Sequence, residues 1–220
     1  MRHHLTMLVC LLPACGLKNR LLNRLGHRVH PTVRFGICFV QRVDRLDLAE
    51  GVRIGNFNAF RFMALVEVGR GSRIVMFNWI LGGSGFEPGA EDHGSLRTLR
   101  MGENAHVISM HYLDCGGGLL MADHSWITGI RCTVLTHAFD PENGGVILEP
   151  VTLEEAAAVA TNCTVLPGVT IGEGALLAAG STAWTRQQVT PRNLHGGVPA
   201  RRLAPLTIAP SLYDRQRYEP

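Results

Sequence analysis

The chain has 220 residues, of which 46% are hydrophobic and 18% are charged, so it can bury one sizeable core and general disorder is excluded. Glycine is frequent, with 25 residues, whereas aromatic residues make up only 6%. This composition argues against an aromatic-centred sandwich and favours tight turns with small aliphatic packing. The net charge is only +3, and the clearest basic stretch is interrupted by leucines, which argues against a nucleic-acid partner.

Residues 1–30 are predicted to form an apolar and basic helical segment. The stretch from Leu5 to Leu17 carries no charge, but a membrane-spanning helix needs about 20 apolar residues. Basic residues interleaved with leucines follow, a pattern typical of a helix lying on a membrane surface: Lys18, Arg20, Arg24 and Arg28. A helix that caps the open end of the core is an equally good interpretation.

The cysteines are scattered and include no Cys-x-x-Cys pair, so neither a zinc ribbon nor a disulfide framework is indicated. We interpret them as reduced core thiols: Cys10, Cys15, Cys38, Cys115, Cys132 and Cys163.

The central part of the chain follows a six-residue period. One run of apolar residues spaced six apart comprises Ile147, Leu153, Val159, Val165, Ile171, Leu177 and Ala183. Small or β-branched residues lie two positions before them, namely Val151, Ala157, Cys163, Val169, Ala175 and Ser181. Three shorter runs have the same spacing, but the distance from one run to the next is not a multiple of six. They are Leu48, Ile54 and Phe60; Val68, Ile74 and Ile80; and Met101, Val107 and Leu113.

This period predicts an all-β solenoid over residues 31–203, in which three six-residue units form one triangular coil. The alternative is an antiparallel β-domain, but no alternating polar pattern is sustained. Stretches near residues 82–98 and 138–146 break the period and are predicted to be loops, where a site would be built. Residues 204–220 are predicted to form a C-terminal tail.

One segment carries a specific family resemblance. It runs from Pro150-Val151-Thr152-Leu153 through Val165-Leu166-Pro167-Gly168-Val169-Thr170-Ile171-Gly172 and Ala179-Gly180-Ser181 to Gly197-Val198-Pro199-Ala200-Arg201. In these motifs the chain resembles the hexapeptide-repeat acyltransferases, particularly the branch with maltose, galactoside and exopolysaccharide O-acetyltransferases. The resemblance implies a left-handed parallel β-helix, and its strongest part covers residues 101–203.

The resemblance also implies a catalytic base. Thr136-His137-Ala138-Phe139-Asp140-Pro141 is similar to the family loop that begins with the catalytic histidine. A hydroxyl is a poor nucleophile at neutral pH, and an imidazole can take its proton and pass it to the leaving thiolate. His137 is therefore the expected base. Asp114 and Asp140 are alternative candidates for the carboxylate that orients its ring, although either could instead cap a turn.

Further site residues follow from position within the family pattern. The resemblance implies that the pantetheine arm of coenzyme A lies along Thr161, Ala179 and Ser181, and that the adenosine 3′-phosphate meets Arg186, Arg201 and Arg202. Trp184 could stack on the adenine or simply pack at the edge of the coil.

The chain departs from the family pattern in two ways. Many relatives carry an amide that holds substrate, where this chain has Ser109 and His111; these two are our candidates for contact with the acceptor. Glycines expected at two turns are absent from Met121-Ala122-Asp123 and Leu153-Glu154-Glu155, so the backbone there must adopt a conformation that other residues tolerate.

The function implied by the resemblance is transfer of an acetyl group from acetyl-CoA to a sugar hydroxyl in polysaccharide biosynthesis, by a homotrimer without a metal. The acceptor would be a sugar or a lipid-linked saccharide. The protein would be cytoplasmic, with peripheral contact to the inner membrane through residues 1–30. One alternative is a zinc enzyme similar to γ-carbonic anhydrases, with His106, His111 and either His124 or His137 as ligands. Another is a solenoid scaffold without catalytic activity.

Overall fold

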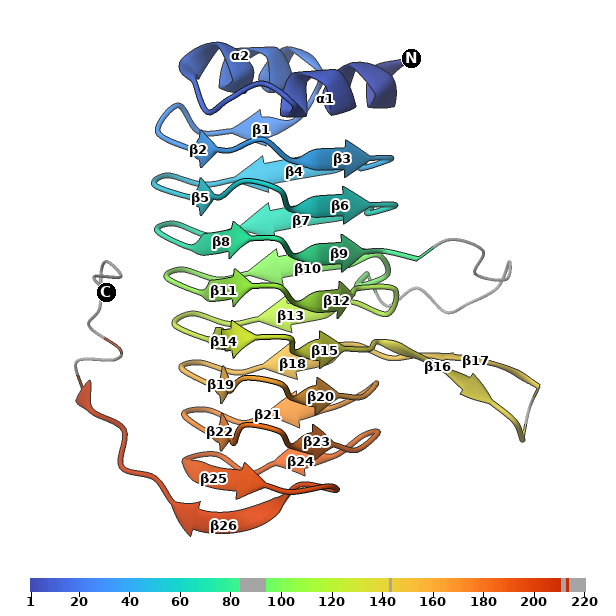
Figure 1. Ribbon diagram of the computed structural model, residues 1–220, viewed down its shortest axis with the longest axis vertical. Helices are drawn as coiled ribbons and strands as arrows, with labels where there is room; N and C mark the ends of the chain where they lie inside the picture. The colour runs from blue at the N-terminus through green and yellow to red at the C-terminus, as the bar shows by residue number, and fades with distance from the viewer. Residues whose placement is uncertain (84–93, 143, 211–212, 214–220) are drawn as a thin grey trace.

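The computed structural model describes residues 1–83, 94–142, 144–210 and 213. Short parallel strands wind around one long axis, with two helices across the N-terminal end and a hairpin projecting from the side (Figure 1). The predicted all-β solenoid is confirmed.

Three parallel sheets form the walls. Sheet A contains β1 (Arg28–Val29), β4 (Arg45–Leu48), β7 (Leu65–Val68), β10 (Thr98–Met101), β13 (Leu119–Met121), β18 (Val151–Leu153), β21 (Thr170–Ile171) and β24 (Gln188–Val189). Sheet B contains β2 (Arg34–Phe35), β5 (Arg53–Ile54), β8 (Arg73–Met76), β11 (His106–Ser109), β14 (Trp126–Ile130), β19 (Ala158–Val159), β22 (Leu176–Leu177) and β25 (Asn193–Gly196), with β26 (Arg201–Pro205) antiparallel at its end. Sheet C contains β3 (Phe39–Gln41), β6 (Ala59–Arg61), β9 (Trp79–Leu81), β12 (Tyr112–Asp114), β15 (Thr133–Val134), β20 (Thr164–Val165) and β23 (Thr182–Ala183).

The register of the strands explains the slips of phase in the sequence. In the C-terminal coils Thr152 pairs with Thr170, a repeat of 18 residues, which is three units of six. In the N-terminal coils Asp47 pairs with Glu67, a repeat of 20 residues. The two extra residues lie where sheet C passes into sheet A, between inward-facing Phe60 and Val68.

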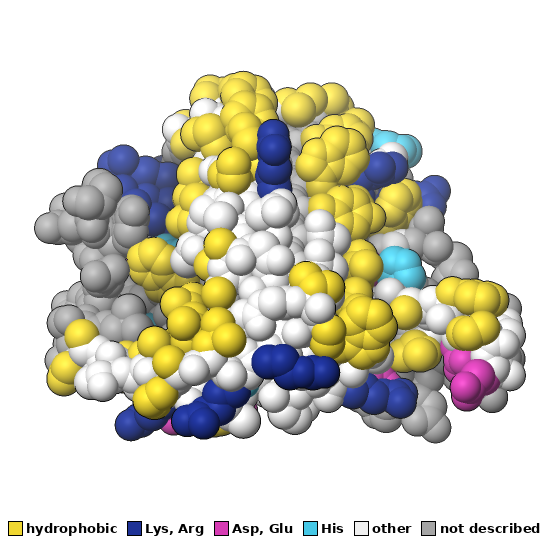
Figure 2. All heavy atoms as spheres, turned by 60° about the horizontal axis from the view of Figure 1, so that its bottom comes forward, with side chains coloured by type: hydrophobic (Ala, Val, Ile, Leu, Met, Phe, Trp, Pro, Cys, Tyr) yellow, Lys and Arg dark blue, Asp and Glu magenta, His cyan; other side chains and the backbone are white. Residues whose placement is uncertain are grey.

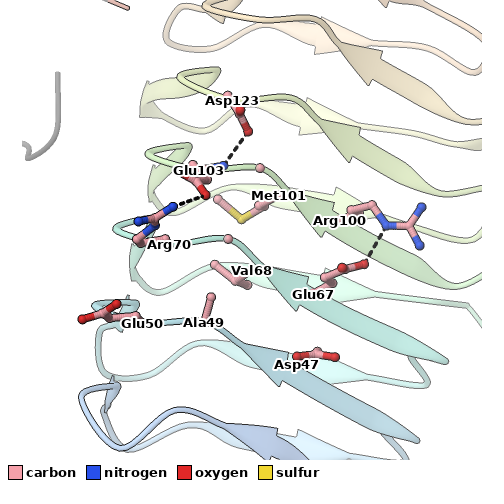
Figure 3. Close-up of a pocket in the computed structure, with 12 residues that line it drawn as sticks. Asp47, Ala49, Glu50, Glu67, Val68, Arg70, Arg100, Met101, Glu103 and Asp123 are labelled. Carbon is pink, nitrogen blue, oxygen red and sulfur yellow. Dashed lines mark hydrogen bonds and ion pairs between the residues drawn. The ribbon is translucent and has the colours of Figure 1, made fainter. Parts of the chain in front are cut away.

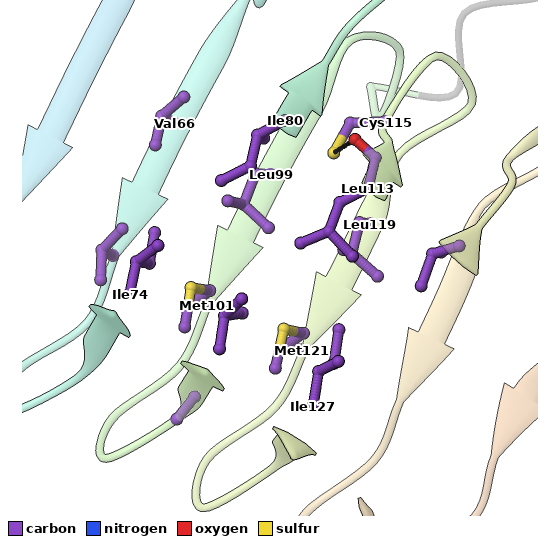
Figure 4. Packing of buried hydrophobic residues seen from close by; sticks show 14 of the residues in the cluster. Val66, Ile74, Ile80, Leu99, Met101, Leu113, Cys115, Leu119, Met121 and Ile127 are labelled. Carbon is purple, nitrogen blue, oxygen red and sulfur yellow. Dashed lines mark hydrogen bonds between the residues drawn. The ribbon is translucent and has the colours of Figure 1, made fainter. Parts of the chain in front are cut away.

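The core consists of columns of aliphatic side chains stacked inside the coil (Figure 4). The periodic residues from Leu153 to Ala183 are buried, and so are their small partners from Val151 to Ser181, as predicted. The assignment of Ile147 to this run was wrong, because Ile147 lies in the projecting hairpin and not in the coil. Its six-residue distance from Leu153 is coincidental.

A second internal column consists of polar and thiol side chains at the corner between sheets B and C: Cys38, Asn58, Asn78, His111, Cys132, Cys163 and Ser181. These side chains bond to backbone groups of neighbouring coils; Asn78 Nδ2, for example, donates to the Ile108 carbonyl over 2.9 Å. Burial raises the pKa of the Cys132 thiol to about 11. All six cysteines are free, but Cys15 is exposed, which corrects its interpretation as a core thiol.

Helices α1 (Arg2–Cys10) and α2 (Gly16–Arg24) cover the open end of the first coil (Figure 1). The N-terminal segment thus contains two short helices, and β1 begins at Arg28. Across the described parts of the chain, no helix has the length and apolar character needed to cross a bilayer.

The two segments predicted to be loops differ from that prediction in different ways. Residues 138–146 belong largely to a two-stranded antiparallel hairpin, β16 (His137–Asp140) and β17 (Gly145–Leu148). Most of the stretch 82–98 lies outside the described residues, and its last residue, Thr98, begins β10. At the two turns that lack glycine, His124 and Ala156 have φ angles of +59° and +55°, so ordinary residues occupy left-handed backbone there.

Candidate active site

His137 is the first residue of the hairpin, at the point where the chain leaves sheet C after β15. Asp114 is the last residue of β12, the neighbouring strand of sheet C. Parallel pairing of Leu113 with Val134 aligns the ends of these two strands. The solenoid therefore brings together side chains that are 23 residues apart in the sequence.

The imidazole of His137 bonds to the carboxylate of Asp114, with 2.8 Å between Nδ1 and Oδ2. The side chain of Asp114 is only 2% exposed, whereas that of His137 is 44% exposed. The carboxylate thus fixes the ring from the protein side while the ring remains open to a ligand. A proton on Nδ1 leaves Nε2 as the basic nitrogen.

Backbone groups and one hydroxyl hold the Asp114 carboxylate in place. Oδ1 accepts the Gly116 N–H over 3.1 Å, and Oδ2 accepts the Thr136 N–H over 2.8 Å. The Thr136 hydroxyl lies 2.8 Å from Oδ2 and accepts the Gly117 N–H. These donors stabilise the ionised carboxylate in a buried position, and the carboxylate in turn can stabilise an imidazolium on His137.

Asp140 lies elsewhere in the hairpin. It is three residues after His137 on the same strand, so the alternation of a β-strand turns the two side chains to opposite faces. Asp140 Oδ1 accepts the Glu142 N–H over 3.0 Å at the hairpin turn. Of the two candidate carboxylates, Asp114 is the one that contacts the histidine.

Ser109 and His111 lie at the corner between sheets B and C, the end of sheet C opposite to His137. The His111 ring is buried in the internal polar column, where Nδ1 accepts the Cys132 N–H over 3.0 Å. Burial lowers the pKa of His111 to about 4, so this ring is neutral at physiological pH. Within the chain the structure does not bring Ser109 or His111 to the His137–Asp114 pair.

Thr161 and Ala179 occupy this same corner, in successive coils. The Thr161 hydroxyl donates to the Ile130 carbonyl over 2.9 Å, and Ala179 is exposed. Ser181 is buried, and its hydroxyl accepts the Gly197 N–H over 3.1 Å. Thr161 and Ala179 therefore present a surface to the outside, whereas the Ser181 side chain faces the coil interior.

Arg201 and Trp184 line a hollow of about 470 Å³ at the last coil, together with Gln187 and Pro199. Figure 2, which brings this end of the solenoid forward, shows basic side chains spread over the surface between hydrophobic patches. The other two candidate arginines have partners inside the chain: Arg186 pairs with the Glu149 carboxylate, and Arg202 Nε donates to Asn193 Oδ1 over 2.6 Å. Arg201 has no ion pair with a described residue.

A different hollow, of about 420 Å³, lies over sheet A in the N-terminal half (Figure 3). Its lining is net acidic, with five carboxylates and two arginines; Arg70 pairs with Glu103 over 2.9 Å and Arg100 with Glu67 over 2.7 Å. It contains none of the predicted site residues.

A metal centre was one of the alternatives from the sequence. Within residues 1–83, 94–142, 144–210 and 213, no three His, Cys, Asp or Glu side chains form a group that could hold a metal ion. His106 is buried against the Trp126 ring, with 4.6 Å between ring centroids.

Sequence reasoning missed the groups that hold the carboxylate. Thr136 stands out in the sequence only as part of the histidine motif, and the amides of Gly116 and Gly117 carry no sequence signal of their own. Their contribution arises from the stacking of one coil on the next.

Comparison with solved structures shows the class of fold. A hexapeptide-repeat-containing acetyltransferase from Vibrio cholerae is similar over 64% of this chain and 74% of its own, with 22% identity and a TM-score of 0.52. AntD, an N-acyltransferase from Bacillus cereus, is similar in its complex with dTDP and 3-hydroxybutyryl-CoA over 86% of this chain and 88% of its own, with 18% identity and a TM-score of 0.55. A mutant of AntD in complex with dTDP-4-amino-4,6-dideoxyglucose and coenzyme A gives 19% identity and a TM-score of 0.55 over 86% of this chain and 90% of its own. No protein-family model and no curated protein matches the sequence.

The chain therefore has the left-handed parallel β-helix fold of the hexapeptide-repeat acyltransferases, as the sequence motifs predicted.

Proposed function

We propose that this protein is an O-acetyltransferase that moves an acetyl group from acetyl-CoA to a sugar hydroxyl, with His137 as general base. The observation that carries this proposal is the 2.8 Å contact between His137 Nδ1 and buried Asp114. A half-exposed imidazole oriented by a buried carboxylate is the arrangement that deprotonates a hydroxyl. It stands at the base of a hairpin on the fold used by acyl-CoA-dependent enzymes.

In the proposed reaction His137 Nε2 takes the proton from the acceptor hydroxyl. The oxygen attacks the thioester carbonyl carbon, the carbon–sulfur bond breaks, and the imidazolium returns the proton to the leaving thiolate. The products are an acetyl ester and free coenzyme A. Asp114 stabilises the transient imidazolium and keeps the required tautomer.

The hollow at the last coil is the proposed binding place for the nucleotide end of the donor. Arg201 is an exposed cation beside an exposed indole, Trp184, and these groups suit a phosphate and an adenine ring. Arg186 and Arg202 would add positive charge at this phosphate if they released Glu149 and Asn193, their partners within the chain. Thr161, Ala179 and Ser181 are proposed to lie along the pantetheine arm, with Ser181 contributing through its backbone.

We propose a homotrimer in which the site is completed at a subunit interface. Support comes from an exposed apolar stripe over sheet C and its corner with sheet B: Phe39, Phe57, Phe77, Trp79, Met110 and Tyr112. Phe57 and Phe77 stack on each other with 5.4 Å between ring centroids. Exposed patches of this kind mark protein interfaces, and a second copy would cover the corner that carries Ser109, Thr161 and Ala179.

The acceptor is proposed to be a sugar or lipid-linked saccharide in polysaccharide biosynthesis, and the acyl-CoA donor would place the activity in the cytoplasm. The AntD complexes contain dTDP or a dTDP-linked amino sugar, so an amino-sugar nitrogen belongs in the same acceptor screen.

The proposal is tested by calorimetric titration of chelator-treated protein with acetyl-CoA, followed by thiol release with sugar acceptors. We expect about one donor site per subunit and release that depends on the acceptor. Donor binding without release for any acceptor would contradict the transferase activity. Bound zinc and no donor binding would favour the metal-enzyme alternative, and tight binding of a protein partner without donor binding would favour a scaffold.

A further inference from the structure

The two N-terminal helices bury several polar side chains and leave several leucines exposed. Helix α1 buries Thr6 and Cys10, whereas Leu5 and Leu8 are 43% and 57% exposed. Helix α2 buries Lys18 and Asn19 along with Leu22, whereas Leu17 is 59% exposed. A surface helix of a globular protein normally turns its leucines inward, so these exposed leucines form apolar surface that the described part of the chain does not cover.

Hydrogen bonds hold the inward Lys18 and Asn19 side chains in place, although Asn19 Oδ1 is buried without a partner among the described residues. Lys18 Nζ donates to the carbonyls of Cys10, Leu12 and Gly36 over 2.9, 3.0 and 2.6 Å. Asn19 Nδ2 donates to the Val33 carbonyl over 3.0 Å. Lys18 therefore closes the open end of the solenoid and cannot meet a membrane, which corrects its place in the predicted basic surface.

The exposed leucines and the basic residues share one outward surface. On a helix of 3.6 residues per turn, Leu17, Arg20 and Arg24 fall opposite to the buried side of α2, and Leu5 and Leu8 fall opposite to the buried side of α1; exposed Leu12 lies in the connection between the helices. Both helices lie across the same end of the solenoid (Figure 1), so their outward sides face away from the coils together. We call this surface the cap face: Leu5, Leu8, Leu12, Leu17, Arg20 and Arg24.

The segment that forms the cap face is basic, although the Asp44 carboxylate lies 3.7 Å from His3 Nε2 at the edge of α1. Seven of the 21 Lys and Arg residues, but none of the 18 Asp and Glu residues, lie within residues 1–43. No carboxylate among the described residues forms an ion pair with Arg20 or Arg24. Acyl chains below anionic headgroups complement both the leucines and the arginines of this surface.

We propose that the cap face docks this protein on an anionic lipid bilayer, with the leucines in the headgroup boundary and the arginines at lipid phosphates. The long axis of the solenoid is then roughly perpendicular to the membrane plane. His137, on the fifth coil, would lie roughly 30 Å from the plane, from four coil spacings of about 4.8 Å and a helix layer of about 10 Å. If the proposed transferase function holds, a lipid-linked acceptor must carry its reacting hydroxyl on a sugar well away from the lipid.

The test is flotation of the full chain, without substrates, with vesicles of equal parts phosphatidylglycerol and phosphatidylcholine at low salt. We expect binding that is at least tenfold weaker for pure phosphatidylcholine vesicles and at high salt. The double variant Leu5→Ser/Leu8→Ser and the double variant Arg20→Gln/Arg24→Gln should each lose binding at least tenfold. Leu203→Ser is the matched control, because Leu203 is 61% exposed at the opposite end, and it should bind like the parent.

Equal binding by Leu5→Ser/Leu8→Ser would overturn the proposal. The absence of vesicle binding by the parent would also overturn it. So would self-association of the parent that this variant abolishes, because the cap face would then be a contact between copies of the chain. Thiol release with a free sugar acceptor should be unchanged in Leu5→Ser/Leu8→Ser. Failure of the docking proposal is therefore distinguishable from failure of the transferase proposal.

Discussion

The Asp114 carboxylate contacts the His137 imidazole over 2.8 Å while both of its oxygens accept backbone N–H groups. Asp114→Asn would turn an amide N–H₂ toward one of these donors and disturb the tautomer of the ring. We predict that kcat for thiol release falls by about 10²-fold or more and that the protein loses about 1–3 kcal/mol of stability. Steady-state kinetics and thermal unfolding measure the two effects.

Asp140→Asn is the comparison that separates the two candidate carboxylates. Because Asp140 lies at the hairpin turn, this variant should change kcat by less than about threefold. A larger loss for Asp140→Asn than for Asp114→Asn would contradict the geometric assignment.

Arg201 is predicted to recognise the 3′-phosphate of the donor. Arg201→Ala should raise KM for acetyl-CoA roughly tenfold, because a charge-assisted contact is lost, and should leave KM for 3′-dephospho-acetyl-CoA nearly unchanged. Arg192→Ala is a suitable control, since Arg192 at the same end is paired with Glu173. An equal effect of Arg201→Ala on both donors would show that Arg201 does not contact this phosphate.

Ala156 is buried at a turn with φ of +55°, a backbone conformation that is unfavourable for residues with a Cβ. Ala156→Gly is therefore predicted to stabilise the protein by about 1 kcal/mol. The neighbouring variant Ala157→Gly, at a buried position without positive φ, should destabilise it by a similar amount. Urea unfolding of the two variants checks both signs, and a loss of stability in both would argue against left-handed backbone at residue 156.

His111 makes the stability of the fold depend on pH. Burial lowers its pKa from 6.5 to about 4 in the folded protein, so the unfolded chain binds an extra proton between these values. Stability from His111 is thus complete above about pH 6.5 and is lost progressively as the pH falls towards about 4.

His111→Asn removes this titration and keeps an acceptor for the Cys132 N–H; asparagine already occupies the same column at Asn58 and Asn78. Urea unfolding at several pH values should show a slope reduced by up to about 1.4 kcal/mol per pH unit in that range. Exposed His4→Asn should leave the slope unchanged. A parental slope in His111→Asn would mean that another group carries the acid sensitivity.

The six-residue period made the solenoid predictable, because every coil repeats the same inward positions. The period could not exclude Ile147, since a hairpin residue six positions before Leu153 has the same local pattern. It also could not distinguish Asp114 from Asp140. That distinction depends on the pairing of Leu113 with Val134 between coils, which no local pattern encodes.

Burial of charge was equally hard to predict from the sequence. Lys18 belongs to a basic run in the sequence, yet its ammonium group is 0% exposed and bonds three carbonyls. Those carbonyls come from the end of α1, the connection after it and the first coil, so their convergence is a property of the folded cap.

The central claim is that His137 is the base of an acyl transfer. The most direct measurement is the rate of thiol release by His137→Ala at saturating acetyl-CoA and acceptor, alongside calorimetric binding of acetyl-CoA to the same variant. We predict a rate at least about 100-fold lower, with the dissociation constant of acetyl-CoA changed by less than about twofold. A variant that releases thiol at the parental rate would contradict the claim.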